Sequence, residues 1–471
     1  MRIRFLVITF LFFSVNLRAQ ENKLSLKQCI ETALKNNTLV KQSGLQADAE
    51  AINVKQARAN MLPDLNANFG YGFNRGRNVD PLTNSYINQQ LASSNVGLSS
   101  GIILFNGMRF QNLVQQNNLN YAAAKMDLQQ QKDNLTLNVI LAYLQVLSNA
   151  DVLAANNAQI AVTKTQAERI EILVKEGAAA GYLLADLKGQ VANEEISIIN
   201  AANALEIFKL NLSQLMGVAY SSNMELENEA AAFPLAEYTN SAAELYKTSL
   251  QNFALLKAHD LKIKSAQKAI RVSQAGFYPR IGLSANLGSS YSSLAQTLRP
   301  ANISEVQTGN YIFVNGLKNE VLTQQQNFSF SKTGYARQLN NNLGNFVGIN
   351  MQIPLFNSWQ TKNNIKLAKI NAKNTQLQSD NAKLELQQNI EQAHLNMKAA
   401  FEKYKVLNRQ VVNFEESFRA AEVRFNSGVI NAAEYLVSKN NFDRSKINEA
   451  QARYEYSFRI RVLDYYEGTI K

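Results

Sequence analysis

Four segments of the chain alternate apolar and polar residues with a period of two, beginning near Leu65, Val96, Ile281 and Val347. One face of each segment carries large apolar side chains, and the other carries Asn, Gly, Ser and Gln. Such alternation predicts β-strands. Each segment has about ten residues, the length of a tilted strand that crosses a bilayer, and this patterning is typical of a transmembrane barrel. Taken alone, the strands fit a soluble antiparallel sheet with one wet face equally well.

The strands form two predicted hairpins, at about 65–104 and about 281–355. Four strands are too few to close a barrel, because the smallest bacterial barrels have about eight. An open sheet edge in lipid leaves backbone groups unpaired at a cost of several kcal/mol each. Other copies of the chain must therefore complete the sheet. This accounting predicts an oligomer without fixing the number of copies.

After the second and fourth strands the apolar period becomes helical. Between Gln360 and Ser427 the predicted seam steps by three and four residues, from Ile365 through Asn389 to Phe425. This is the period of a left-handed coiled coil. No proline or glycine interrupts the stretch, so a helix of about 100 Å is predicted, with a counterpart at about 110–176. An ordinary dimeric coiled coil fits this seam equally well.

Both long helices are predicted to end at a glycine, Gly177 or Gly428, and helical patterns resume soon afterwards. Two helical hairpins are therefore expected, at about 107–218 and about 358–471. Their turns are predicted at 176–181 and 427–431.

The chain contains an internal duplication. Residues 30–65 align with 246–281 at an offset of 246 − 30 = 216, and 96–109 align with 347–360 at an offset of 347 − 96 = 251. The difference, 251 − 216 = 35, is an insertion between the two strands of the second half. The predicted domains are therefore a first repeat at 20–218, a linker at 219–240 and a second repeat at 241–471.

Residues 1–19 have the basic start, the short apolar run and the small residue at the end that are typical of a cleaved signal peptide. The chain is therefore expected to be exported. No later segment has 18 consecutive apolar residues, so no transmembrane helix is predicted.

Composition excludes several classes of protein. The formal charge is +11, and removal of Arg2, Arg4 and Arg18 leaves 11 − 3 = +8, with no Lys/Arg cluster that would bind nucleic acid. One cysteine, Cys29, and two histidines argue against a disulfide framework and a metal site, and Cys29 is expected to be a buried residue on a helix. No nucleophile elbow or phosphate-binding loop is present, so neither an enzyme nor a cofactor is predicted.

The order of elements and several motifs together resemble the TolC family of outer-membrane efflux and secretion channel proteins. The resemblance covers the mature chain and rests on the following segments: LSLKQCIETALKNN, ARANMLPDLNANFG and its repeat VSQAGFYPRIGLSANLG, GIILFNGMR and QIPLFNSWQ, EILVKEGAAAGYLLADL and VRFNSGVINAAEYLV, and LSQLMG and LDYYEG.

The resemblance implies an α+β membrane protein in the cell outer membrane that extends into the periplasm. Each chain of a homotrimer would contribute four β-strands to a shared transmembrane β-barrel and long antiparallel helices to a periplasmic α-barrel. Such a channel gives passive passage in a tripartite efflux or type I secretion system. Its partners are a periplasmic adaptor (membrane fusion protein), an inner-membrane pump or exporter and outer-membrane lipid. The alternative is a coiled-coil cell-envelope structural or adhesion protein without channel activity.

The resemblance also implies roles for residues near the helical turns. By position after the turn glycine, Glu434 matches an acidic gate site of the family, whereas Val437 replaces a second one. Asp186 holds the first-half position equivalent to Val437. Arg424 and Phe425 resemble residues that pack or dock at the tip. A solvated helix face for the two acids, and the last seam position for Phe425, are the alternatives.

Aromatic residues near the strand ends are candidates for the membrane interface. Those predicted to lie there are Trp359, Phe356, Tyr278 and Tyr71. The loops between paired strands, at roughly 75–95 and 289–345, are expected to be polar and to face outside, and the longer one carries the insertion. No pattern in the sequence identifies the cargo.

Overall fold

The computed structural model describes residues 23–79, 84–88, 90–228 and 236–469. The predicted signal peptide at 1–19 and part of the predicted linker at 219–240 lie outside the described residues.

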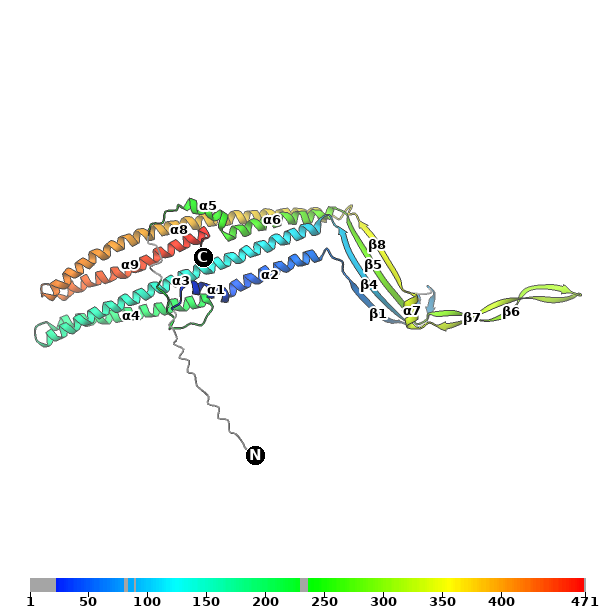
Figure 1. The fold of residues 1–471 in the computed structure, drawn as a ribbon, viewed down its shortest axis with the longest axis horizontal. Coiled ribbons are helices and arrows are strands. Elements are labelled where there is room, and N and C mark those ends of the chain that lie inside the picture. Colours follow the sequence, from blue (N-terminus) through cyan, green and yellow to red (C-terminus); the bar gives the residue numbers. More distant parts are fainter. Residues whose placement is uncertain (1–22, 80–83, 89, 229–235, 470–471) are drawn as a thin grey trace, which may run out of the picture. The chain divides into compact units, whose positions relative to one another are not determined.

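The two halves of the chain contain the same order of main elements (Figure 1). The first half consists of α1 (Leu26–Asn36), α2 (Thr38–Ala59), β1 (Asn66–Asn74), β2 (Arg77–Val79), β3 (Tyr86–Asn88), β4 (Leu91–Phe105), α3 (Arg109–Lys175) and α4 (Gly181–Met216). The second half consists of α5 (Ala242–Asn252), α6 (Ala254–Gln274), the short turn η2 (Ala275–Phe277), β5 (Arg280–Ser292), β6 (Gln296–Val314), β7 (Leu317–Lys332), α7 (Tyr335–Asn341), β8 (Gly344–Gln352), α8 (Gln360–Asn426) and α9 (Ala432–Glu467).

The helices recur at the two offsets found in the sequence. α3 and α8 each have 67 residues, and α4 and α9 each have 36. The starts of these two pairs of helices differ by the larger offset, 360 − 109 = 251 and 432 − 181 = 251. Ser25 and Ser241, which are related by the smaller offset, 241 − 25 = 216, begin α1 and α5 with reciprocal capping boxes. In each box the serine hydroxyl accepts a hydrogen bond from the backbone N–H three positions later, and the side chain at that position accepts one from the serine N–H.

The chain divides into two compact units, each built from both halves. The helical unit consists of Met1–Ala51, Leu119–Lys264 and Lys373–Lys471, and the strand unit consists of Ile52–Asn118 and Ser265–Ala372. This division cuts across the sequence repeats, because strands of one half pair with strands of the other and helices of one half pack on helices of the other.

In the strand unit, four antiparallel strands form one sheet in the order β1-β4-β5-β8 (Figure 1). β4 pairs with β5 and so joins the two halves, with Leu98 opposite Leu287. β4 begins at Leu91, ahead of the predicted start at Val96, because its ladder with β1 continues to the pair Asn74 and Leu91. β8 ends at Gln352 rather than at Leu355, since Pro354 has no N–H to donate.

The sheet has one apolar face that no described element covers. Phe69, Val347 and Ile349 are 68%, 71% and 70% exposed. Their strand neighbours on the opposite face are Asn and Gly residues, as the alternation predicted, with Phe346 as the one large apolar side chain among them. An apolar face left so open in one chain requires a lipid or protein environment.

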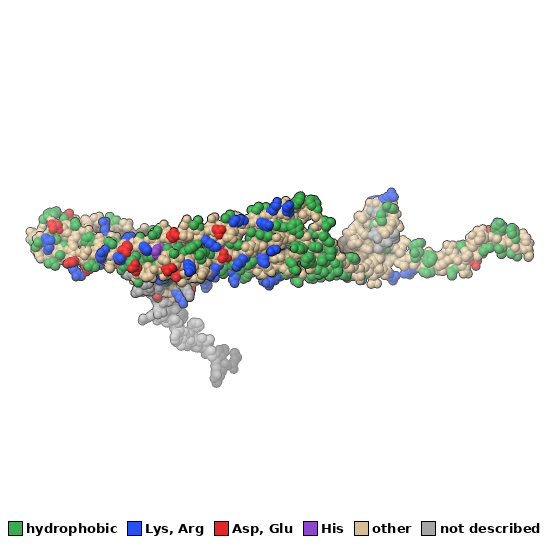
Figure 2. Space-filling view, turned by 90° about the horizontal axis from the view of Figure 1, so that it is seen from above, with side chains coloured by type: hydrophobic (Ala, Val, Ile, Leu, Met, Phe, Trp, Pro, Cys, Tyr) green, Lys and Arg blue, Asp and Glu red, His purple; other side chains and the backbone are tan. Residues whose placement is uncertain are grey.

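The insertion in the second half is not the polar loop that the sequence predicted. β6 and β7 form their own two-stranded sheet, with Leu298 opposite Phe330 and Pro300 opposite Phe328. Large apolar side chains are exposed along this hairpin, and hydrophobic side chains cover its tip at the far right of Figure 2. The prediction was wrong because the polar Gln, Asn and Ser residues of the segment alternate with apolar ones across the hairpin.

The short helix α7 anchors the base of this hairpin to the sheet. The buried Gln338 side chain accepts a hydrogen bond from the Ser292 N–H at 2.9 Å and donates one to the Ser292 carbonyl at 3.0 Å. The rings of Tyr291 and Tyr335 lie 4.8 Å apart. The hairpin therefore leaves the sheet from a fixed base.

In the helical unit, α8 buries a seam against α5 and α9. Leu386, Met397 and Ala400 of the predicted seam are buried, but Asn389 is exposed and Ile390 is fully buried instead. With Ile390 the buried positions from Leu386 to Ala400 step by four and three residues in turn, so the predicted period holds and only this one position was wrong.

A second core joins α1, α3 and α4, and it contains Cys29 at 0% exposure, as predicted. α3 is long and apolar enough by length and composition to cross a membrane, contrary to the expectation of no such helix. Core helices of soluble domains pass the same test. Since Val139 and Tyr143 are fully buried in this core, we assign the apolar stretch of α3 to packing.

Candidate functional site

Two helical turns and the strand–helix junctions carry most of the residues singled out from the sequence. The turns belong to the helical unit and the junctions to the strand unit, so each is described separately.

Each long helix ends in a glycine with left-handed backbone. Gly177 has φ +71° and Gly428 has φ +72°, a region that glycine occupies without strain. The Ala178 N–H donates to the Leu173 carbonyl at 2.8 Å, and the Val429 N–H donates to the Arg424 carbonyl at 2.9 Å. Both turns thus satisfy the last carbonyls of the helix by the same hydrogen-bond pattern.

The predicted gate residue Glu434 takes part in capping α9. The Asn431 side chain accepts a hydrogen bond from the Glu434 N–H at 2.9 Å and donates one to Glu434 Oε1 at 3.3 Å. The Glu434 carboxylate lies in the first turn, where the helix dipole favours a negative charge. Asp186 and Val437 are exposed. Val437 follows Glu434 by three residues on α9 and so lies beside it on the helix surface, whereas Asp186 lies on α4.

Phe425 packs into the end of the seam. Its ring stacks on Tyr435 at 4.6 Å between centroids, and it contacts the small core of α3 and α4 near the turns. Arg424, by contrast, is exposed. Burial raises the pKa of Tyr435 to about 12, so this phenol stays neutral.

A buried charged cluster links the two helical hairpins. Lys439 on α9 is 1% exposed, and its Nζ lies 3.3 Å from Glu194 Oε1 on α4 and 2.6 Å from Asp443 Oδ2. Glu194 Oε1 also accepts a hydrogen bond from Thr163 Oγ1 at 2.9 Å and one from Gln190 Nε2 at 2.9 Å. Buried charges must be paired and hydrogen-bonded in this way to be tolerated.

Further links join the same hairpins nearer their turns. Arg169 on α3 donates to the side chain and the carbonyl of Asn426 at the end of α8, and Gln190 donates to Asn440 Oδ1 at 3.1 Å. The sequence analysis missed these residues. One signal was available for the cluster: Lys439 stands at seam spacing between Tyr435 and Phe442, where an apolar residue is expected.

The junctions between strand and long helix use the same turn in both halves. Gly107 and Met108 have φ +67° and +62°, and their counterparts at the larger repeat offset, Ser358 and Trp359, have φ +52° and +61°. Gly107 is required by space as well, because an added Cβ would lie 2.7 Å from Tyr278 Cβ. The duplicated motifs GIILFNGMR and QIPLFNSWQ therefore encode this turn.

The predicted interface aromatics are all exposed. Trp359, Phe356, Tyr278 and Tyr71 have exposures of 57%, 75%, 57% and 54%. The ammonium of Lys362 lies 4.1 Å from the centre of the Trp359 ring, and Phe356 meets that ring edge-on. Exposed aromatic rings with a nearby cation suit a lipid headgroup region.

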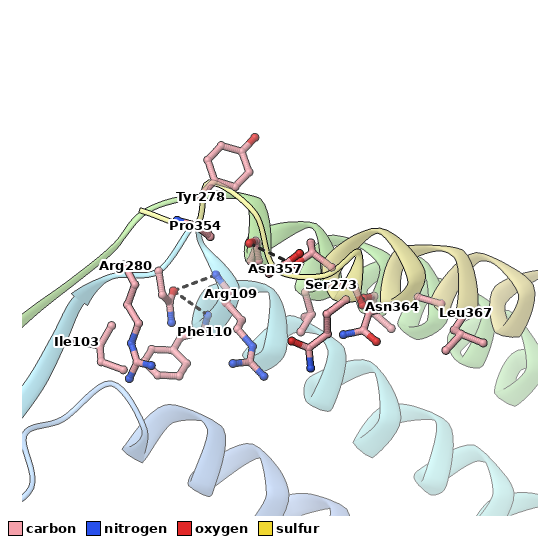
Figure 3. A pocket seen from close by; sticks show the side chains of 18 of the residues that line it. Ile103, Arg109, Phe110, Ser273, Tyr278, Arg280, Pro354, Asn357, Asn364 and Leu367 are labelled. Atoms are coloured by element: carbon pink, nitrogen blue, oxygen red, sulfur yellow. Dashed lines mark hydrogen bonds between the residues drawn. The ribbon is translucent and has the colours of Figure 1, made fainter. Parts of the chain in front are cut away.

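A cavity of about 920 Å³ lies where β5, α3, α6 and α8 meet within the strand unit. Asn106 begins α3 there by accepting hydrogen bonds from the Arg109 and Phe110 N–H groups at 3.0 and 3.4 Å. The side chains of Arg109 and Arg280 extend into the cavity, whereas the ring of Tyr278 points to the other side of the chain (Figure 3).

An open antiparallel sheet with an apolar outer face, combined with two long helical hairpins, defines a membrane-channel subunit. The chain belongs to the outer membrane efflux protein family, whose model matches residues 29–218 and 245–459. Among curated relatives, outer membrane protein TolC of Salmonella enteritidis is 24% identical over 454 residues, which cover 95% of this chain and 82% of that protein. TolC of Escherichia coli (strain K12) is 24% identical over 443 residues, covering 92% and 80%.

Solved structures of similar fold are outer membrane proteins. The outer membrane protein VceC of Vibrio cholerae has a TM-score of 0.72 at 14% identity, covering 94% of this chain and 96% of that one. The open state of the MtrE outer membrane channel of Neisseria gonorrhoeae has a TM-score of 0.70 at 17% identity, covering 95% and 89%.

Membership of this family confirms the class of protein that the sequence predicted. The chain is an outer-membrane efflux channel for tripartite efflux systems, and its family is not a class of enzymes. The predicted TolC family, fold class and outer-membrane location are confirmed. Among the described residues, no group of three or more His, Cys, Asp or Glu side chains could hold a metal ion.

Proposed function

We propose that three copies of this chain form one trans-envelope conduit. In this assembly twelve strands close a barrel in the outer membrane, and the helical hairpins form a tunnel in the periplasm. Passage through the conduit is passive. The helical turns dock on a periplasmic adaptor, and an inner-membrane pump or exporter supplies the energy.

The open edges of the sheet carry this proposal. Of the described strands, β1 pairs only with β4 and β8 pairs only with β5, so each leaves one side without a partner. With an apolar outer face, such a sheet is stable in lipid only when its edges are paired. The β8 edge of one copy would therefore pair with the β1 edge of the next.

Apolar stripes on the helices support an assembly as well. Leu377, Leu384 and Leu395 of α8 are 49%, 55% and 62% exposed and share one face of that helix. On α4, Ile196 and Ile199 form a similar exposed stripe. These faces would be covered by helices of neighbouring copies.

Crosslinking between β1 and β8 tests the proposal. Four strands spaced about 4.8 Å apart place the two edges of one chain about 14 Å apart, which is too far for a disulfide. Cysteine at Phe69, combined in turn with cysteine at Val347, Ile349 or Met351, can therefore crosslink only between chains. In isolated outer membranes, with Cys29 replaced by Ala, oxidation is expected to give covalent dimers and trimers for at least one pair.

The matched control places cysteines at Phe69 and Val96, which are register partners within one chain. This pair is expected to crosslink inside the monomer. If the control forms its disulfide while all three β1–β8 pairs remain monomeric, the shared barrel is excluded. A largest covalent species other than a trimer would instead refute the copy number.

For the acidic gate we propose that three Glu434 carboxylates converge at the closed tip and repel one another. The Glu434→Gln variant is then expected to show altered single-channel conductance and cation block. Glu402→Gln, at an exposed position on α8, is the control. Unchanged conductance and cation block in Glu434→Gln would refute the gate role and leave Glu434 only its role in capping α9.

A further inference from the structure

The four strands of the sheet contain a single charged residue, Arg280. The strands β1, β4 and β8 have none, and Arg280 is the first residue of β5. The other residues of the polar face are uncharged: mostly Asn, Gly, Ser and Gln, with Leu91, Ile103 and Phe346 among them. The electrostatic potential at this face is therefore set by very few groups.

Arg280 lies on the polar face. With a strand period of two it shares the side of Gly282 and Ser284, opposite to the apolar Ile281 and Leu283. Arg280, Gly282 and Ser284 line one cavity on this face, and Arg280 also lines the cavity at the junction together with Arg109. Two guanidinium groups thus reach the same cavity in each chain (Figure 3).

No described carboxylate compensates these two arginines. Neither guanidinium has an acidic partner within 4.0 Å in the part of the chain that the structure describes. One acidic residue, Asp64, lines a cavity together with Arg280 and is its counterpart in the first half (64 + 216 = 280). Asp64 accepts a hydrogen bond from the Gly101 N–H at 2.6 Å and another from Asn66 Nδ2 at 3.1 Å. Among the residues that line these two cavities, each chain therefore contributes 2 − 1 = +1.

We propose that Arg280 and Arg109 make the conduit select anions where the strands meet the helices, and that its cargo includes solutes bearing phosphate or carboxylate groups. The inference rests on the proposed trimer, in which three copies repeat these charges around one lumen. A guanidinium presents a planar fork that matches both anions in two-point contact. Low-dielectric walls focus the field of fixed charges into a narrow aqueous path.

Ion selectivity measured in planar bilayers tests the inference. A lumen potential of about one kT raises chloride about threefold and lowers potassium about threefold, so the chloride-to-potassium permeability ratio changes by about sevenfold. With the full-length protein in a potassium chloride gradient, the wild type is expected to show a ratio above one. The ratio should rise as the salt is diluted from 1 M to 0.1 M, because the Debye length grows from about 3 to about 10 Å.

The variants separate charge from structure. Arg280→Gln and Arg109→Gln should each lower the ratio several-fold, and Arg280→Lys should retain most of it. Lys362→Gln is the matched control: that cation lies 4.1 Å from the centre of the Trp359 ring, it lines neither cavity, and its loss should leave the ratio unchanged.

Each outcome is decisive. A wild type that conducts without preferring chloride, or arginine variants with an unchanged ratio, would overturn the inference and leave the channel intact. A wild type without conductance would overturn the proposed conduit on which the inference depends.

Discussion

Replacing Lys439 by Met should open the contact between the two helical hairpins. The substitution keeps the length of the side chain but removes the charge that lies between Glu194 and Asp443. The side chains of these two acids are 5% and 17% exposed, so water compensates them poorly. Removal of one partner from a buried ion pair costs about 3–5 kcal/mol. The structure points to the upper part of this range, because Glu194 Oε2 is already buried without a hydrogen-bond partner.

Hydrogen exchange of the amides around position 439 in α9 measures this cost. Since about 1.4 kcal/mol corresponds to a tenfold change, a cost of about 4–5 kcal/mol should accelerate local exchange by about 10³- to 4 × 10³-fold. Lys405→Met is the control: Lys405 pairs with Glu402 across an exposed turn, and loss of that pair should cost less than about 0.5 kcal/mol. The triple variant with Glu194→Gln and Asp443→Asn should recover most of the protection, because no uncompensated charge then remains. Exchange in Lys439→Met within twofold of the wild type would refute the reasoning.

Three further results are expected. Gly107→Ala should destabilise the protein by about 1–3 kcal/mol, because its φ is +67° and the new Cβ would lie 2.7 Å from Tyr278 Cβ. The control, Gly189→Ala, lies in open space on α4 and should be neutral or stabilising by up to about 1 kcal/mol. Thermal unfolding in detergent compares the two variants. Burial raises the pKa of Asp443 above 3.8, against the opposing effect of Lys439, so the folded state binds the proton more tightly than the unfolded state. The stability of the fold should therefore fall as the pH rises through the window above 3.8. The Asp443→Asn variant should lack this dependence in a series of unfolding temperatures measured against pH. Replacing 296–332 by a short turn should leave the assembly and its conductance intact, because β6 and β7 pair only with each other among the described strands; loss of the oligomer on gel filtration would contradict this.

The sequence predicted the repeating framework well because the signals are local and strong. Gly177 and Gly428 mark helix ends through the left-handed conformation that the turn needs. The larger repeat offset reappears in the starts of α8 and α9 because both halves use the same turns. Period-two alternation also placed the apolar face of β8 correctly.

Other features depended on long-range contacts that no local pattern reveals. Ile390 and not Asn389 occupies the seam, because steps of three and four residues can alternate in either order and only packing decides between them. The sequence predicts a polar loop where β6 and β7 form a hairpin, because the apolar residues of this segment are spread over two strands and come to lie opposite one another only when the strands pair. The Lys439 cluster joins positions far apart in the chain, so the one local sign of it is a lysine at a seam position where an apolar residue is expected.

The two units place charged side chains in opposite environments, buried and paired in one and exposed in the other. This contrast separates charges that stabilise the fold from charges that act in transport. In the helical unit, Lys439 is buried and its charge is balanced by acids of two helices, so its removal is expected to change stability first. In the strand unit, Arg280 is exposed and is the one charged residue of the four strands of the sheet, and the described residues give it no acidic partner within 4.0 Å. An exposed, unpaired charge contributes little to folding, since water solvates it fully. Its substitution should therefore leave the fold unchanged and alter only what passes along that face, which makes Arg280→Gln a selective test of transport.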